Sequence, residues 1–314
     1  MPSSLPHPRA VDHHGDNRGL DRDARQRRAV VLMLACVAVF SLMDAMLKTL
    51  SAHYPPFQVA ALRGAASLPW LVAWAALTTG LRPLLHARWS LHLLRGVLGI
   101  AMMAAFVFAL QTLPLSTAYT IYFVAPLLIT ALSVPFLGEH VGPRRWTAIV
   151  VGFLGVMVVL RPGGSGVFTT AGLAVLLAAF AYAVSAITVR ILARTDSTQS
   201  MVVWLMLFMA LGAGALAWPE WRAIRGEHAW VVFALGLTGA LGQYLITEAF
   251  RLGEASLLAP FEYTALVWGV LLDATLWGVL PGAMTWLGAA IIVASGLYMF
   301  RRERVLEQAA PQDS

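Results

Sequence analysis

Residues 114–146 read PLSTAYTIYFVAPLLITALSVPFLGEHVGPRRW, and a shift of 140 positions brings them onto residues 254–286, EASLLAPFEYTALVWGVLLDATLWGVLPGAMTW. Each stretch contains a largely apolar run of about 20 residues, which is long enough to cross a bilayer. Positions that keep the same residue in both copies include Ser116/Ser256, Ala125/Ala265, Gly138/Gly278, Gly142/Gly282 and Trp146/Trp286. A duplicated apolar segment near the end of each half predicts a membrane protein built from two repeats.

The composition also indicates a membrane protein. The 314 residues are 59% hydrophobic and 12% charged, and the mean hydropathy is +0.73. A soluble chain is about 45–50% apolar and about 25% charged. The net charge of +6 does not indicate nucleic-acid binding, because the basic residues fall in short loops and tails, where they orient helices. A single cysteine, Cys36, excludes an intramolecular disulfide. We expect an all-α integral membrane protein whose surroundings are the lipid bilayer.

Ten apolar segments, separated by short turns rich in Gly, Pro and charge, are candidate transmembrane helices. They are 29–51, 56–79, 91–112, 115–137, 145–161, 170–193, 199–218, 229–251, 255–277 and 282–301. The predicted organisation is a disordered cytoplasmic tail over 1–28, a first five-helix repeat over 29–161, a second over 162–302 and a cytoplasmic tail over 303–314.

The arginines predict how the chain lies in the membrane. Most of them fall in the tails and in the loops on the same side as the N-terminus, whereas Arg161, Arg222 and Arg225 fall on the other side. The positive-inside rule then places both termini in the cytoplasm, in the inner (cytoplasmic) membrane. Each half has an odd number of helices, so equivalent helices cross in opposite senses. The two repeats are therefore predicted to be inverted, related by a pseudo-twofold axis in the membrane plane.

Several motifs resemble the EamA-type drug/metabolite transporters. They are APLLITALSVPFLGE at 125–139, a Gly-rich helix at 152–163, APFEYTALVWG at 259–269 and Arg63 in the second helix. The resemblance covers about 29–302 and implies ten helices and secondary transport of small metabolites, many members being exporters of amino acids or related compounds. Residues 114–146 are most similar to the riboflavin or nucleoside-like cofactor carriers. In the first copy Glu139 follows Gly138. The family often has Glu after the corresponding Gly of the second copy too, but here Val279 follows Gly278.

Ionisable groups inside membrane helices are expensive to bury and are candidates for function. Six occur here: Asp44, Lys48, Arg63, Glu248, Glu262 and Asp273. Asp44 and Lys48 are four residues apart on one helix and can pair with each other, or Asp44 can act as a gate or coupling group. Arg63 either braces the first two helices through a carboxylate such as Asp44 or contacts a substrate anion. Glu248 either lines the cytoplasmic mouth or pairs with Arg251.

Glu262 is the strongest candidate for substrate binding. It follows Pro260, which distorts a helix, and the 140-residue shift places Tyr122 at its mirror position. A central pocket is therefore predicted from Glu262, Tyr122, Tyr119, Phe123, Phe261, Tyr263 and Gln243. Aromatic faces would stack on a planar ring, while the carboxylate, amide and hydroxyls would orient it. The alternative is that the rings only pack helices and Glu262 hydrogen-bonds to a neighbouring helix.

The predicted activity is alternating access without a cofactor. The sequence GGSG at 163–166 lacks the Lys of a phosphate-binding loop, so ATP is not indicated. An intramembrane enzyme would need a metal or nucleophile constellation, yet the histidines fall in loops or at helix ends and no metal site is expected. A scaffold or a channel remains a third class. The chain leaves its oligomeric state open, and a monomer is compatible with it.

Overall fold

The computed structural model describes residues 13–85, 88–138, 141–160, 170–252, 258 and 261–309, and these residues form helices joined by short turns. The helices of the first half are α1 His13–Ser51, α2 Pro56–Thr78, α3 Trp89–Leu110, α4 Leu115–Tyr122, α5 Ala125–Leu137 and α6 Pro143–Leu160. Those of the second half are α7 Thr170–Leu192, α8 Thr198–Phe208, α9 Gly214–Ala217, α10 Ala229–Leu252, α12 Ala265–Trp277 and α13 Ala283–Ala309. A π-helical turn, Met209–Ala213, joins α8 to α9, and short 3₁₀ turns occupy Arg82–Leu85, Trp218–Glu220 and Gly226–His228.

The described helices follow the predicted spans over most of their length, because the apolar runs and their flanking turns mark the boundaries in the sequence. Eight helical segments are long and apolar enough to cross a membrane. Two shorter apolar helices, Ala265–Trp277 and Ala283–Met299, lie within the last two predicted ranges.

Helix α1 begins at His13, inside the stretch 1–28 that the sequence predicts as a disordered tail. Helix α13 likewise continues to Ala309, into the stretch predicted as the C-terminal tail. A formed helix propagates through good helix formers such as Arg and Gln, so an apolar span can extend beyond its membrane segment.

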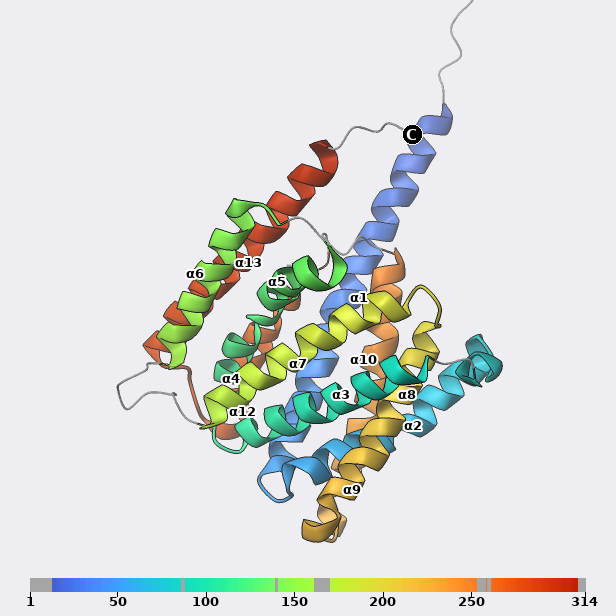
Figure 1. Ribbon diagram of the computed structural model, residues 1–314, viewed down its shortest axis with the longest axis vertical. Coiled ribbons are helices and arrows are strands. Elements are labelled where there is room, and N and C mark those ends of the chain that lie inside the picture. Colours follow the sequence, from blue (N-terminus) through green and yellow to red (C-terminus); the bar gives the residue numbers. More distant parts are fainter. Residues whose placement is uncertain are drawn as a thin grey trace, which may run out of the picture.

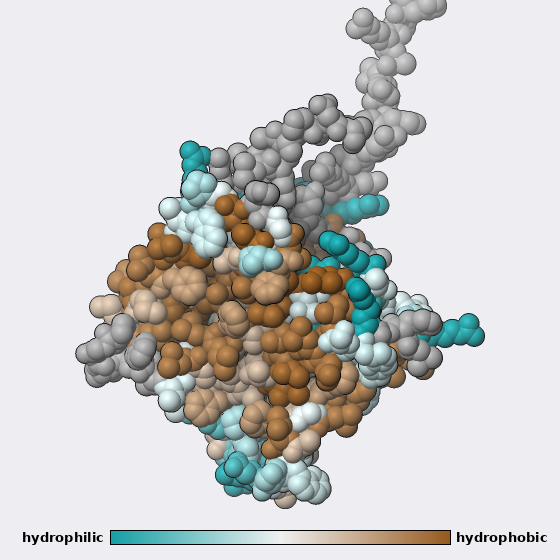
Figure 2. Space-filling view, viewed as in Figure 1, coloured by the Kyte–Doolittle hydropathy of each residue, from teal (hydrophilic) through white to brown (hydrophobic). Residues whose placement is uncertain are grey.

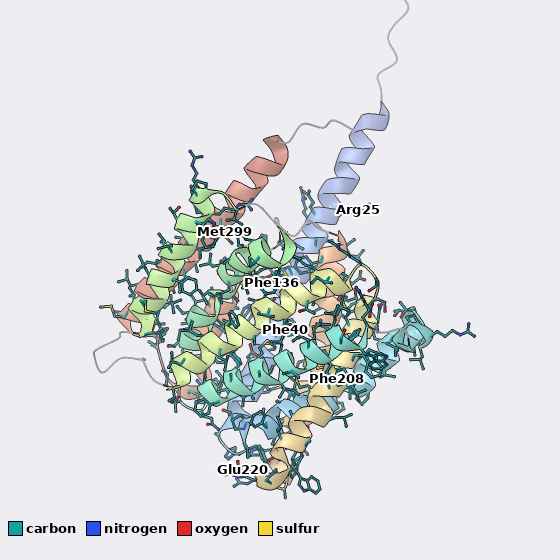
Figure 3. The ribbon with its side chains drawn as sticks, in the orientation of Figure 1. Arg25, Phe40, Phe136, Phe208, Glu220 and Met299 are labelled. Carbon is teal, nitrogen blue, oxygen red and sulfur yellow. The ribbon has the colours of Figure 1, made fainter. Side chains whose placement is uncertain are left out.

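Three long helix pairs build the bundle. Helix α1 packs along α10, α3 along α7, and α6 along α13 on one flank of the molecule (Figure 1). The start of α1 and the end of α13 lie at the same end of the molecule, which we call the terminal side (Figure 1). Arg25 and Met299 lie toward this side, whereas Glu220 lies at the other end, which we call the opposite side (Figure 3).

Apolar side chains cover the middle of the face shown in Figure 2, and polar residues gather toward the ends. Large apolar residues such as Leu77, Val267 and Leu280 are exposed on the surface, as expected for side chains that meet lipid rather than water. Between helices, small residues permit close approach. A Cβ on Gly155 of α6 would lie 3.2 Å from the Gly288 carbonyl of α13, so these two helices touch through their backbones.

Candidate substrate site

The helix that follows each central turn is built in the same way in the two halves. In the first copy, helix α4 ends at Tyr122 and α5 starts at Ala125. In the second copy, 140 residues later, Glu262 is helical, Tyr263 and Thr264 form a turn, and α12 starts at Ala265. Helices α5 and α12 are both 13 residues long. They end on Gly138 and Gly278, whose φ angles of 68° and 64° are left-handed and favour glycine.

The two breaks arise from different local chemistry. Pro126 has no N–H to donate, so the first break follows directly from the sequence. The second copy has Leu266 at this position, and its N–H donates to the Tyr263 carbonyl at 3.1 Å instead of reaching back one residue further to Glu262. Pro260, the residue predicted to distort this helix, lies outside the described residues. Both breaks place polar backbone within an apolar segment, where it is tolerated if it lines a protein interior or a cavity.

Tyr122 and Glu262 occupy equivalent places, each as the last helical residue before its break. The Glu262 carboxylate lies within electrostatic range of the hydroxyls of Tyr122, Tyr182 and Tyr263 and of the Cys36 thiol. Tyr122 and Glu262 therefore share one electrostatic environment. Tyr182 of α7 and Cys36 of α1 join this environment although the sequence did not single them out for it.

Aromatic rings surround these two positions. The Phe123 ring centroid lies 5.0 Å from that of Tyr263 in an edge-to-face arrangement and 6.5 Å from that of Tyr119. The Tyr122 ring lies 5.8 Å from Phe106 and 5.7 Å from Tyr182. These separations fall in the range of favourable ring pairs. Tyr119, Phe123 and Tyr263 are only 6–8% exposed, so the site is closed to solvent in this conformation.

Asp44 and Arg63 add charge to the same region. The Tyr119 hydroxyl donates a hydrogen bond of 2.7 Å to the Asp44 carboxylate. Arg63 is electrostatically coupled to Asp44 and Tyr122, and its Nη1 donates to the Met103 Sδ at 3.7 Å. Its Nε is buried and has no hydrogen-bond partner among the described residues. The coupling to Asp44 fits a brace between α1 and α2, and the free Nε keeps a donor available to a ligand.

Lys48 does not pair with Asp44, although the spacing of four residues allows it. Its Nζ forms an ion pair of 3.0 Å with Asp273 of α12 and lies 4.3 Å from the centroid of the Trp277 ring. The pairing expected within α1 is therefore wrong, because Asp44 accepts from Tyr119 and Lys48 extends to the buried Asp273 instead. The local spacing carried no information about this partner, which is 225 residues away.

The three remaining predicted residues lie on α10 or pack against it. Phe261 packs against a separate apolar cluster that contains Met33, Ala249 and Leu258. Gln243 is half-buried on α10, and the contacts of the described residues do not connect it with the rings. Glu248 is half-buried on the same helix, five residues further on. Within the described part of the chain, no three His, Cys, Asp or Glu side chains come together to hold a metal.

A hollow of about 230 Å³ opens on the opposite side of the molecule. Its lining includes His53, Tyr54, Gln111, Glu220 and Arg222. The hollow contains none of the predicted substrate-site residues.

The sequence profile of the EamA-like transporter family matches this chain twice, over residues 27–161 and 169–301. Three curated relatives carry different substrate names. A riboflavin transporter of Rhizobium johnstonii is 32% identical over 76% of this chain and 77% of its own length. A pseudopaline exporter of Pseudomonas aeruginosa is 25% identical over 88% and 98%. An S-adenosylmethionine uptake transporter of Rickettsia conorii is 29% identical over 83% and 88%.

Among solved structures, one chain described as "Crystal structure of protein" superimposes with a TM-score of 0.64. It covers 88% of this chain and 98% of its own length at 22% identity, so the similarity concerns the fold alone.

Proposed function

Because the chain belongs to the EamA-like transporter family, we propose that it is a secondary carrier that moves a small metabolite across the cytoplasmic membrane by alternating access. Because it belongs to this family, the chain is a small-molecule transporter. The names of its relatives indicate transport rather than catalysis. The substrate, the mechanism and the orientation are the parts that we propose.

The proposed scaffold is ten transmembrane helices in two inverted repeats, 29–161 and 162–302. The double match of the family profile supports it. The helix interfaces support it as well: a shift of 140 residues carries α1 onto α7 and α3 onto α10, so the α1–α10 pair corresponds to the α7–α3 pair. The same shift carries α6 onto α13. The contact between α6 and α13 therefore corresponds to itself, with the two helices exchanged. A pseudo-twofold axis produces this pattern.

Glu262 carries the proposal for the site. A carboxylate at a helix break, within electrostatic range of three tyrosines and beside a row of aromatic rings, has the composition of a small-molecule pocket. The rings suit a planar heterocycle, so our first candidate substrate is riboflavin or a nucleoside-like compound. The riboflavin transporter of Rhizobium johnstonii supports this choice.

A second candidate class is an amino acid or a related zwitterion. The observation that favours it is the buried Arg63, which keeps a free Nε close to Asp44 and Tyr122. An arginine binds a carboxylate well, and Asp44 or Glu262 would attract an amine or another cation. The pseudopaline and S-adenosylmethionine relatives support this class.

Counterflow in proteoliposomes distinguishes the two classes. Vesicles preloaded with unlabelled compound receive labelled riboflavin, adenosine, S-adenosylmethionine or lysine. Saturable exchange of riboflavin or adenosine supports the first class, and exchange of S-adenosylmethionine or lysine alone supports the second. Linear flux, or no flux by protein with normal helix content, contradicts a carrier of either class.

The positive-inside rule supports the proposed orientation, with both termini cytoplasmic. Single cysteines at Arg222 and at Arg194 test it in whole cells. An impermeant thiol reagent added outside should label position 222 and leave position 194 unlabelled. The reverse pattern contradicts the orientation.

A further inference from the structure

Asp273 is a buried carboxylate with several hydrogen-bond donors around it, and it is not one of the residues of the proposed substrate site. It is 0% exposed and lies on α12, one turn from the end of that helix on the opposite side of the bundle. Its Oδ1 accepts from Lys48 Nζ and from the Leu115 backbone N–H, both at 3.0 Å. Its Oδ2 accepts from the Ser116 N–H at 2.8 Å and from the Ser116 hydroxyl at 2.7 Å.

These contacts join helices that belong to different packed sets. Helices α12 and α4 pack directly against each other; beyond this contact, α12 packs against α1, which packs along α10, whereas α4 packs against α7, which packs along α3. The contacts around Asp273 form a junction between these two sets. Asp273 and Lys48 belong to the set of α1, α10 and α12, and the first two residues of α4 belong to the set of α3, α4 and α7. The first N–H groups of a helix have no partner within the helix and carry its positive end, so a buried carboxylate is well placed to hold them.

The same junction positions the rings of the substrate site. Gly269 lies one turn before Asp273 on α12, and a Cβ there would lie 2.7 Å from the Tyr119 ring. Helix α4 has only eight residues, with Tyr119 and Tyr122 in its second half. Asp273 and Gly269 thus fix both the start of this short helix and the ring of Tyr119 against α12.

We propose that Asp273 is a positioning residue of the transport cycle, which holds α4 against α12 while the opposite side is closed and releases α4 when that side opens. The role rests on the proposed alternating access. In the closed conformation the Ser116 hydroxyl and the two N–H groups are held by the carboxylate. When the two packed sets separate, these groups are exposed to water in the opening mouth, while the ion pair with Lys48 stays within its own set.

The test measures how readily the opposite side opens. Thr120 is 0% exposed, and its hydroxyl bonds to the carbonyl of Ser116 one turn earlier. A Thr120→Cys reporter, with Cys36 replaced by alanine, is labelled with a hydrophilic maleimide in purified, detergent-solubilised protein. We expect Asp273→Asn to raise the labelling rate about tenfold, by shifting the population toward the open conformation. Ser116→Ala removes one contact and should raise it about two- to threefold.

Two controls separate opening from general loosening. Thr188 on α7 is also buried and bonds to the carbonyl four residues earlier, so a Thr188→Cys reporter is a matched site toward the terminal side. Its labelling should not change in Asp273→Asn. Asp196→Asn removes another paired carboxylate, 2.7 Å from His92 on the terminal side, and should not accelerate labelling at position 120.

An unchanged rate at position 120 in both Asp273→Asn and Ser116→Ala would overturn the proposal. Equal acceleration at positions 120 and 188 would overturn it too, because Asp273 would then only stabilise the fold. Neither outcome depends on the substrate. The proposed carrier function fails separately, through absence of saturable counterflow by the wild-type protein.

Discussion

The two copies of the central segment share a backbone and differ in their side chains. In both, a helix stops at the same position, a two-residue turn follows, and a 13-residue helix ends on a left-handed glycine. Yet Tyr122 in the first copy corresponds to Glu262 in the second, and Ser133 corresponds to Asp273. The acidic member of each pair is in the second copy. The duplicated fold supplies the frame, and the substitutions between copies supply the charge.

The largest expected effect comes from removing the charge that distinguishes the second copy. Glu262→Gln should lower the rate of saturable counterflow about 10- to 100-fold, because a charged hydrogen bond contributes about 1.5–3 kcal/mol. Glu220→Gln is the matched control, since this glutamate is exposed on the opposite side, and it should transport normally. Normal transport by Glu262→Gln would remove Glu262 from the site.

Exchanging the two residues tests whether the mirror positions are interchangeable. The double variant Tyr122→Glu/Glu262→Tyr restores one carboxylate at the first break, so its counterflow should exceed that of Glu262→Tyr alone by about tenfold. If the double variant is no better than the single variant, the two positions do not serve one site. Both proteins are compared at equal amounts of folded carrier in the vesicles.

A smaller effect is expected at Tyr119, whose hydroxyl links the first copy to Asp44. Tyr119→Phe leaves the buried carboxylate without this donor and should destabilise the protein by about 1–3 kcal/mol. A lower thermal midpoint in detergent, followed by tryptophan fluorescence, is the measurement. An unchanged midpoint would show that Asp44 does not depend on this hydroxyl.

The smallest effect is expected at Tyr263, the ring of the second copy that corresponds to Phe123 in the first copy. The Tyr263 hydroxyl is buried but has no hydrogen-bond partner among the described residues. Tyr263→Phe should therefore change stability by less than about 0.5 kcal/mol, or raise it slightly, because a desolvated hydroxyl is removed. The same thermal measurement on both variants compares the two copies. A loss as large as that of Tyr119→Phe would show that Tyr263 has a partner in the folded protein.

The sequence predicted the helices well because membrane spans are encoded locally, by apolar length and flanking turns. The 140-residue register also pairs Tyr122 with Glu262, and each of them is the last helical residue before a two-residue turn. The spacing within α1 predicted the wrong partner for Lys48. Its side chain pairs with Asp273 on α12 rather than with Asp44, four residues earlier on α1. Local spacing also missed Tyr182, and it grouped Phe261 with the rings although that side chain packs in another cluster. Contacts between distant helices decide such partners, and no local pattern records them.

The central claim is that one site between the two breaks binds the transported molecule through Glu262. The most direct test is counterflow of labelled riboflavin and of labelled S-adenosylmethionine. The wild-type protein and Glu262→Gln are measured separately, in vesicles prepared in the same way. The account predicts saturable exchange of one of these compounds by the wild type and a loss of at least about tenfold in Glu262→Gln. Equal saturable exchange by both proteins would contradict it.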